Sequence, residues 1–185
     1  FDLLDPGIEE FAAYVGVPQI RGGSGITGYG GSAIVTGYYR RGLSQSLTAG
    51  AEFQGDRNQQ MGGLSAGYAS PVGTFAVSTA LSRDGRKGLG SQFLLNYQLG
   101  GERALFFGAP SLDLELRSRS RNFIAVGDLP RSDLTRFELR SRFSATIAKN
   151  YGVGLFGLLT FRHEGRPATY AVGANLSTQL LGLSV

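Results

Sequence analysis

The chain has 185 residues, enough for one large domain or for one coherent part of a larger protein. It combines 29 glycines, 12 phenylalanines and 8 tyrosines with only 17% charged residues, which suits repeated, closely packed strands and is unlike a helical enzyme. Cysteine is absent, which excludes disulfides and thiolate metal sites. The net charge of +4 comes from arginines interleaved with acidic residues, which indicates a wet, arginine-rich face and no nucleic-acid partner.

The first third of the chain opens with a turn-rich segment and one strand. Residues 1–10 are acidic and rich in turn formers, and residues 11–17 alternate apolar and polar side chains, which predicts a first strand. Six glycines follow within residues 21–31. This stretch lacks the lysine-serine or lysine-threonine ending, and the helix after it, that a phosphate-binding loop needs. We therefore expect a flexible connection there.

Nine further segments show a period of two between short, turn-rich connectors. They are expected as strands at residues 32–41, 46–55, 60–70, 73–83, 88–99, 111–123, 134–147, 151–163 and 168–180. Most connectors are too short for a parallel crossover, so consecutive strands should be antiparallel neighbours. The sequence therefore predicts an all-β protein of about ten antiparallel, up-and-down strands.

The alternation is clearest at residues 111–147. Leucine and phenylalanine occupy one set of alternate positions (the apolar parity), and charged residues occupy the other set (the charged parity). The charged parity carries six arginines and three acidic residues on two neighbouring strands. A protein core could not desolvate that density without near-complete pairing, so this face must be wet. We expect the wet face to line a pore through Glu52, Asp113, Glu115, Arg117, Arg119, Arg121, Arg136, Glu138, Arg140 and Arg142.

The apolar parity must be covered by a second sheet or by lipid. The expected strands have roughly 10 to 13 residues, which matches a tilted strand that crosses a bilayer, whereas strands of soluble sandwiches usually have about 5 to 6 residues. We therefore expect transmembrane β-barrel strands whose lipid-facing residues are Phe75, Val77, Phe93, Leu95, Tyr97, Leu112, Leu114, Leu116, Phe137 and Leu139. Phe156 and Leu158 break the pattern, because they fall on the polar parity.

Several stretches carry a rhythm of small strand motifs. They are LLDPGIEEFAAYVGVPQ, SAIVTGYYRRGLSQSLTAGAEFQGD, MGGLSAGYASPVGTFAVSTALS, LELRSRSRNFIAVGD and RFELRSRFSATIAKNYGVGLFGLLTF. Together they resemble the outer-membrane usher of the chaperone/usher pilus assembly pathway. The first stretch is similar to the usher segment that leads from the plug back into the barrel. The resemblance covers nearly the whole chain and includes no invariant catalytic residue.

The resemblance implies that residues 1–185 are a single segment, the middle portion of a usher barrel with roughly twice as many strands. It places the chain in the bacterial outer membrane as part of a pore that assembles and translocates pilus subunits. The implied partners are pilus subunits, periplasmic chaperone-subunit complexes and the lipid bilayer. No enzymatic activity, cofactor or metal is implied. The expected edge strands, residues 11–17 and 168–180, would pair with the remainder of the barrel or with another chain.

Two other classes remain open. A small, self-contained ten-stranded outer-membrane barrel, acting as a passive pore or an enzyme, would use the same alternation. A soluble β-sandwich binding module would bury the apolar parity against a second sheet. Closure between the first and the tenth strand distinguishes the small barrel, and solubility without detergent distinguishes the sandwich.

Two sets of residues could carry chemistry. His163 and Glu164 could act as base and orienting acid if Ser82 or Ser177 approached, although a lone histidine in an expected turn is better explained as an exposed hairpin residue. The carboxylates of Asp113 and Glu115 share a face, as in a glycosidase or a metal pair. The nearby arginines favour cross-strand ion pairs instead; these are Arg117, Arg119, Arg140 and Arg142.

Overall fold

The computed structural model describes residues 2–17, 19–21, 27–29, 32–100, 110–125, 135–148, 151–180 and 183–184. Within these ranges the chain forms strands and turns but no helix, so none is long and apolar enough to cross a membrane. The strands are β1 (Glu9–Gly16), β2 (Gln19–Arg21), β3 (Thr27–Tyr29), β4 (Ile34–Ser44), β5 (Leu47–Gly55), β6 (Gln59–Ser70), β7 (Gly73–Asp84), β8 (Gly88–Leu99), β9 (Ser111–Arg119), β10 (Thr135–Ala148), β11 (Tyr151–Arg162), β12 (Thr169–Leu180) and β13 (Leu183–Ser184).

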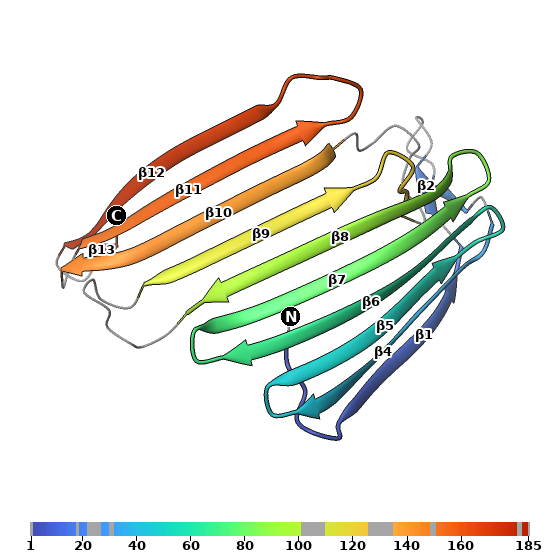
Figure 1. Cartoon of the computed structure of the whole chain (residues 1–185), viewed down its shortest axis with the longest axis horizontal. Helices are drawn as coiled ribbons and strands as arrows, with labels where there is room; N and C mark the ends of the chain where they lie inside the picture. Colours follow the sequence, from blue (N-terminus) through green and yellow to red (C-terminus); the bar gives the residue numbers. More distant parts are fainter. Residues whose placement is uncertain are drawn as a thin grey trace.

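One sheet dominates the described part of the chain. It contains 11 strands in the order β1-β4-β5-β6-β7-β8-β9-β10-β11-β12-β13, and every neighbouring pair is antiparallel. Ten of these strands are long, whereas β13 has two residues. Figure 1 shows the long strands side by side in a single layer, with β4 to β8 joined by short hairpins at alternating ends. The expected all-β, up-and-down meander is confirmed.

The strand bounds differ from expectation in two informative places. Residues 21–31 were expected to be a flexible connection, but β2 pairs with β3 in a separate two-stranded sheet that includes Arg21 and Thr27–Tyr29. Residues 22–26 and 30–31 of that stretch lie outside the described residues. The strand expected to end at residue 123 ends at Arg119, because the chain turns back over the sheet after it.

The pairing register sorts side chains into the two faces expected from the sequence. Paired residues lie on the same face of an antiparallel sheet, and the face alternates along each strand. One cross-strand row contains Val77, Leu95, Leu116, Leu139 and Leu159. The next row in the same face contains Phe75, Tyr97 and Leu114. All ten residues assigned to the apolar parity therefore share one face.

The apolar face has no cover from the described part of the chain. Among its side chains, Phe11 is 76% exposed, Leu64 is 66% exposed and Val172 is 85% exposed. The few buried hydrophobic residues in the described ranges are Ala76, Ala80, Phe123, Ile124 and Ala145. A continuous apolar surface of this extent is unusual for a soluble monomer and indicates contact with lipid or another protein.

The sheet is open. In the described residues β1 pairs only with β4, and β12 pairs with β11 and with the two-residue β13. Only Gln179 and Leu180 of β12 have partners in β13. The long strands at the two margins of the sheet therefore do not pair with each other.

Candidate functional site

The candidate site is the charged face of the sheet, opposite the apolar face. Register places Glu52 and Arg119 in one row that crosses β5 to β9. Arg117 is the partner of Glu138, Glu115 is the partner of Arg140, and Asp113 is the partner of Arg142. Eight of the ten residues expected on the wet face thus share a face: Glu52, Asp113, Glu115, Arg117, Arg119, Glu138, Arg140 and Arg142.

The other two expected residues lie outside the regular rows. Arg121 is in the turn that follows β9, and its guanidinium pairs with Glu164 at 3.1 Å. Arg136 lies between Thr135 and Phe137, where the register between β10 and β11 shifts. The alternation of side chains between the two faces is interrupted at a turn or a bulge. Both side chains therefore lie at strand ends, where the sequence pattern does not predict the face.

Ion pairs on β9 and β10 run along each strand rather than across it, which corrects the expected cross-strand network. Arg117 Nη2 lies 3.1 Å from Glu115 Oε1, and Arg140 Nη2 lies 2.9 Å from Glu138 Oε1. Residues two apart in a strand share a face, and the long arginine side chain spans that spacing. The pattern leaves Asp113 and Arg142 without an ion pair among the described residues.

The Arg119 guanidinium makes one hydrogen bond and one contact with an aromatic ring. Its Nε donates to Gln92 Oε1 at 2.6 Å, and its Cζ lies 5.6 Å from the centre of the Phe123 ring. An arginine over an aromatic face gains electrostatic attraction from the ring quadrupole. A cross-strand ion pair of the expected kind occurs elsewhere on this face, where Arg40 Nη1 lies 3.1 Å from Glu10 Oε2.

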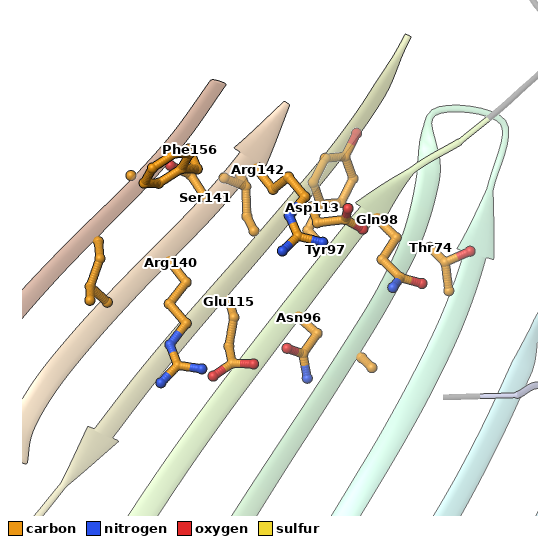
Figure 2. A pocket seen from close by; sticks show the side chains of 14 residues that line it. Thr74, Asn96, Tyr97, Gln98, Asp113, Glu115, Arg140, Ser141, Arg142 and Phe156 are labelled. Carbon is orange, nitrogen blue, oxygen red and sulfur yellow. The ribbon is translucent and has the colours of Figure 1, made fainter. Parts of the chain in front are cut away.

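A groove of about 570 Å³ lies on this face over β7 to β11. Figure 2 shows Arg140, Glu115 and Asn96 in one row, and Arg142, Asp113 and Gln98 in the next. The groove therefore presents carboxylates, guanidinium groups and amides close together on a single curved surface. These groups offer both hydrogen-bond donors and acceptors to an occupant.

Phe156 and Leu158, which break the sequence alternation, belong to this groove. Phe156 is the register partner of both Arg142 and Gly173, and it is 50% exposed. A Cβ atom at Gly173 would overlap the Phe156 ring. Glycine at this position lets the ring lie over β12, so that the groove has an aromatic wall beside its charged residues.

The possible nucleophilic site is not assembled. His163 Nε2 lies 2.9 Å from the Arg119 carbonyl oxygen, beyond the end of β11. Ser177 lies at the other end of the β11-β12 pair, where its hydroxyl donates to the Gly152 carbonyl at 3.3 Å. Ser82 is buried on β7 and accepts the Ile124 N–H at 3.1 Å. The three side chains have separate structural roles.

The possible carboxylate pair is also divided. Glu115 is bound to Arg117, whereas Asp113 is exposed in the groove. Across the ranges that the structure describes, no group of three or more histidine, aspartate or glutamate side chains is placed to hold a metal ion. Mixed charge on a wet surface is therefore the chemistry that this face offers.

Two segments fold back onto the charged face, and sequence analysis did not anticipate either. The first is residues 2–5, which lie over β4 and β5: the Leu4 N–H donates to Thr48 Oγ1 at 2.8 Å, and Arg40 donates to the Asp2 carbonyl. A Cβ at Gly42 would overlap the Asp5 carbonyl oxygen. Glycine on the charged parity of a strand is the sequence signal for such a close approach.

The second segment is residues 120–125, which follow β9 and lie over β7 and β8. The Ser120 N–H donates to the Ser91 carbonyl at 2.8 Å, and Phe123 and Ile124 are 8% and 5% exposed. A Cβ at Gly90 would overlap the Phe123 backbone. The arginine-rich segment that was expected to continue as a strand therefore ends in a small buried cluster.

Within the described ranges, the geometry supplies one mixed-charge face with a groove and one bare apolar face, and the two possible catalytic sets considered above are not assembled there. A surface of this kind can guide or retain a polar passenger and can be embedded through its other side. No protein-family model matches this chain, and no curated protein or solved structure is significantly similar to it.

Proposed function

We propose that this chain is part of the wall of an outer-membrane pore of the usher type, which assembles and translocates pilus subunits delivered by a periplasmic chaperone. The apolar face contacts lipid, and the charged face lines a water-filled lumen. The observation that carries the proposal is the bare apolar face of a single-layer, up-and-down sheet. That face needs cover that the described chain does not supply.

Strand length supports lipid as the cover. The strands β6, β7, β8, β11 and β12 have 12 residues each. At about 3.3 Å per residue such a strand is roughly 40 Å long. A tilt of about 40° reduces its span across the membrane to roughly 30 Å, which exceeds the apolar band of about 25 Å in transmembrane barrels.

The charged face supports a hydrated lumen. Its ion pairs leave mixed charges on the surface, with Arg140 at 56% side-chain exposure. Such a wall holds water and contacts a folded passenger without an adhesive apolar patch. The usher assignment within the pore class is supported by the rhythm of short motifs described above, and the proposal includes no catalysis and no cofactor.

The open sheet favours a larger barrel over a self-contained ten-stranded one. An unpaired strand margin leaves N–H and C=O groups that hydrocarbon cannot satisfy. Register within the described residues does not join β1 to β12. In the proposal, these two strands pair with the remainder of the usher barrel or with another chain.

Cysteine scanning tests the membrane assignment directly, because the chain has no native cysteine. Single cysteines at positions 112–117 would be spin-labelled after the chain is reconstituted in lipid vesicles. We expect labels at Leu112, Leu114 and Leu116 to contact dissolved oxygen in the bilayer, and labels at Asp113, Glu115 and Arg117 to contact a water-soluble nickel chelate. The proposal would be overturned if the accessibility of the labels to oxygen and to the nickel chelate did not alternate from residue to residue. It would also be overturned if the chain stayed dispersed without detergent or lipid.

The usher assignment needs a separate measurement. Vesicles that carry the chain would be floated with purified chaperone-subunit complexes or with chaperone alone. We expect the complexes to float with the vesicles more than the chaperone does. The chain could show the alternating lipid and water contacts and still bind neither the complexes nor the chaperone. It would then be a pore of another kind, such as a passive barrel.

A further inference from the structure

One row of the groove combines three groups that could recognise a ligand. Asp113, Arg142 and Phe156 are consecutive register partners on β9, β10 and β11. Neighbouring strands lie about 5 Å apart, so a carboxylate, a guanidinium and an aromatic ring start from backbone positions within roughly 10 Å. Figure 2 shows all three side chains around the same hollow.

The two charged groups of this row are available for a ligand. Their neighbours Glu115 and Glu138 are bound to Arg117 and Arg140 along their own strands. Asp113 and Arg142 make no ion pair within the described ranges, and both residues are exposed. A ligand that carries one cation and one anion would complete the pairing that the rest of the face completes internally.

The aromatic ring presents an open surface beside these charges. Phe156 is half-exposed, and glycine at position 173 lets its ring lie over β12. The half of the side chain that remains exposed beside the charged groups of the groove is not covered by the described chain. Aromatic rings associate in offset or edge-to-face arrangements, so this position suits an aromatic side chain of a ligand.

We propose that the row Asp113, Arg142 and Phe156 is a binding subsite for a polypeptide segment that presents an aromatic side chain between a cationic and an anionic group. The aromatic ring of the segment packs on Phe156, its anion binds the Arg142 guanidinium, and its cation binds the Asp113 carboxylate. This inference rests on the proposed function, in which the segment belongs to the passenger that moves along the wall.

The smallest probe with all three features is free L-phenylalanine, whose ammonium and carboxylate groups flank one side chain. Three analogues each lack one feature: L-phenylalanine amide lacks the carboxylate, N-acetyl-L-phenylalanine lacks the ammonium group and L-alanine lacks the ring. Binding in an open groove should be weak, with a dissociation constant on the order of millimolar. Saturation-transfer NMR on the reconstituted full chain detects binding in this range, and empty vesicles correct for partition into lipid.

Four variants assign the three contacts. Phe156→Ala should lower L-phenylalanine binding about 2- to 10-fold, and Phe156→Leu should restore only part of it because the aromatic face is absent. Asp113→Asn should weaken L-phenylalanine and its amide but not the N-acetyl form. Arg142→Gln should weaken L-phenylalanine and the N-acetyl form but not the amide.

Arg162→Gln is the matched control, because Arg162 is exposed at the end of β11, on the charged face and outside the groove. The subsite is supported if each charge variant loses only the probes that carry the opposite charge. It is overturned if L-phenylalanine does not bind, if L-alanine binds equally well, or if every variant affects all probes alike. The cysteine scan is independent of these results, so failure of the subsite would leave the pore assignment intact.

Discussion

The two faces of the sheet are stabilised in opposite ways. On the apolar face of β12, Tyr170 is 79% exposed and Leu176 is 72% exposed. On the charged face the chain covers itself twice, with residues 2–5 over Thr48 and residues 120–125 over Ser82. All the buried polar residues of the described part lie on that charged face: Thr48, Ser82, Asp84 and Thr160.

This difference shows where stability comes from on each side. The charged face relies on hydrogen bonds and close backbone contacts within the chain, whereas the apolar face relies on whatever surrounds the sheet. Under the proposed function, substitutions on the apolar face should therefore act on assembly in lipid, and substitutions on the charged face should act locally. The following predictions test that distinction.

The largest effect should come from a charge on the apolar face. Leu139 lies between Leu116 and Leu159 in the apolar face, and Arg140 is its neighbour on the charged face. With lipid against this face, as proposed, Leu139→Arg should destabilise the sheet by about 2–4 kcal/mol. Arg140→Leu breaks an ion pair in which the Arg140 side chain is 56% exposed and the Glu138 side chain 13% exposed, and it should cost less, about 1–2 kcal/mol. Heat-sensitive gel mobility after refolding in vesicles measures both, and equal loss of folded protein would contradict the assignment of the faces.

The next effect should come from added volume under the first covering segment. The Cβ of Gly42→Ala would overlap the Asp5 carbonyl and lie 2.6 Å from the Leu4 carbonyl oxygen. Displacing backbone should cost about 1–3 kcal/mol. The matched control is Gly62→Ala on the apolar face, where the new Cβ would lie 3.9 Å from the Glu52 carbonyl oxygen. Denaturant unfolding should separate the two variants, and equal stability would show that the segment is not packed on Gly42.

A smaller effect should come from the hydroxyl that holds the same segment. Thr48 is fully buried, and its Oγ1 accepts the Leu4 N–H at 2.8 Å. Thr48→Val keeps the side-chain shape but removes this acceptor, at a cost of about 1 kcal/mol. Thr79→Val on the apolar face should have no such cost. Hydrogen exchange at Leu4 should accelerate only in Thr48→Val, and unchanged protection would contradict the role of the hydroxyl.

The sequence predicted the strands and their faces well, because a period of two is a local property of the chain. The strand predicted at residues 88–99 is β8, and the ten residues expected on the apolar face share it. Even Phe156, which broke the alternation, lies on the charged face as its parity indicated. The strand order from β4 to β12 then follows from the chain order, since each of these strands pairs with the next one along the chain, whereas β1 pairs with β4 across the separate β2-β3 sheet.

The two covering segments were not predicted, because they depend on contacts between residues far apart in sequence. Residues 120–125 follow the arginine-rich alternation, yet there the chain leaves the sheet. The Ile124 N–H donates to the Ser82 hydroxyl, and the Phe123 backbone packs against Gly90. The ion pairs were misassigned for a related reason. Period-two counting identifies residues on a common face, but side-chain reach decides whether Glu115 binds Arg117 or Arg140.

The smallest expected effect is a pH dependence at the turn that ends β7. Asp84 Oδ1 accepts the N–H groups of Lys87 and Arg86, each at 2.8 Å, and Oδ2 accepts from the Gln59 amide at 3.1 Å. These bonds, the one from Lys87 above all, lower the pKa of Asp84 below its ordinary value, although burial opposes the shift. A carboxyl whose pKa is lowered by folding stabilises the folded state most when it is ionised.

The stabilisation from Asp84 is therefore present above the ordinary aspartate pKa of about 4, and it is lost as the pH falls through the lower pKa of the folded state. Asp84→Asn keeps an acceptor for the turn but cannot ionise, so it should cost less than about 1 kcal/mol at neutral pH. The free energies of unfolding of both proteins should be measured between pH 7 and pH 3, and the difference between them should become smaller as the pH falls. A gap that stays constant would mean that the charge of Asp84 contributes nothing to the turn, and that the charged face holds this end of the sheet by neutral hydrogen bonds alone.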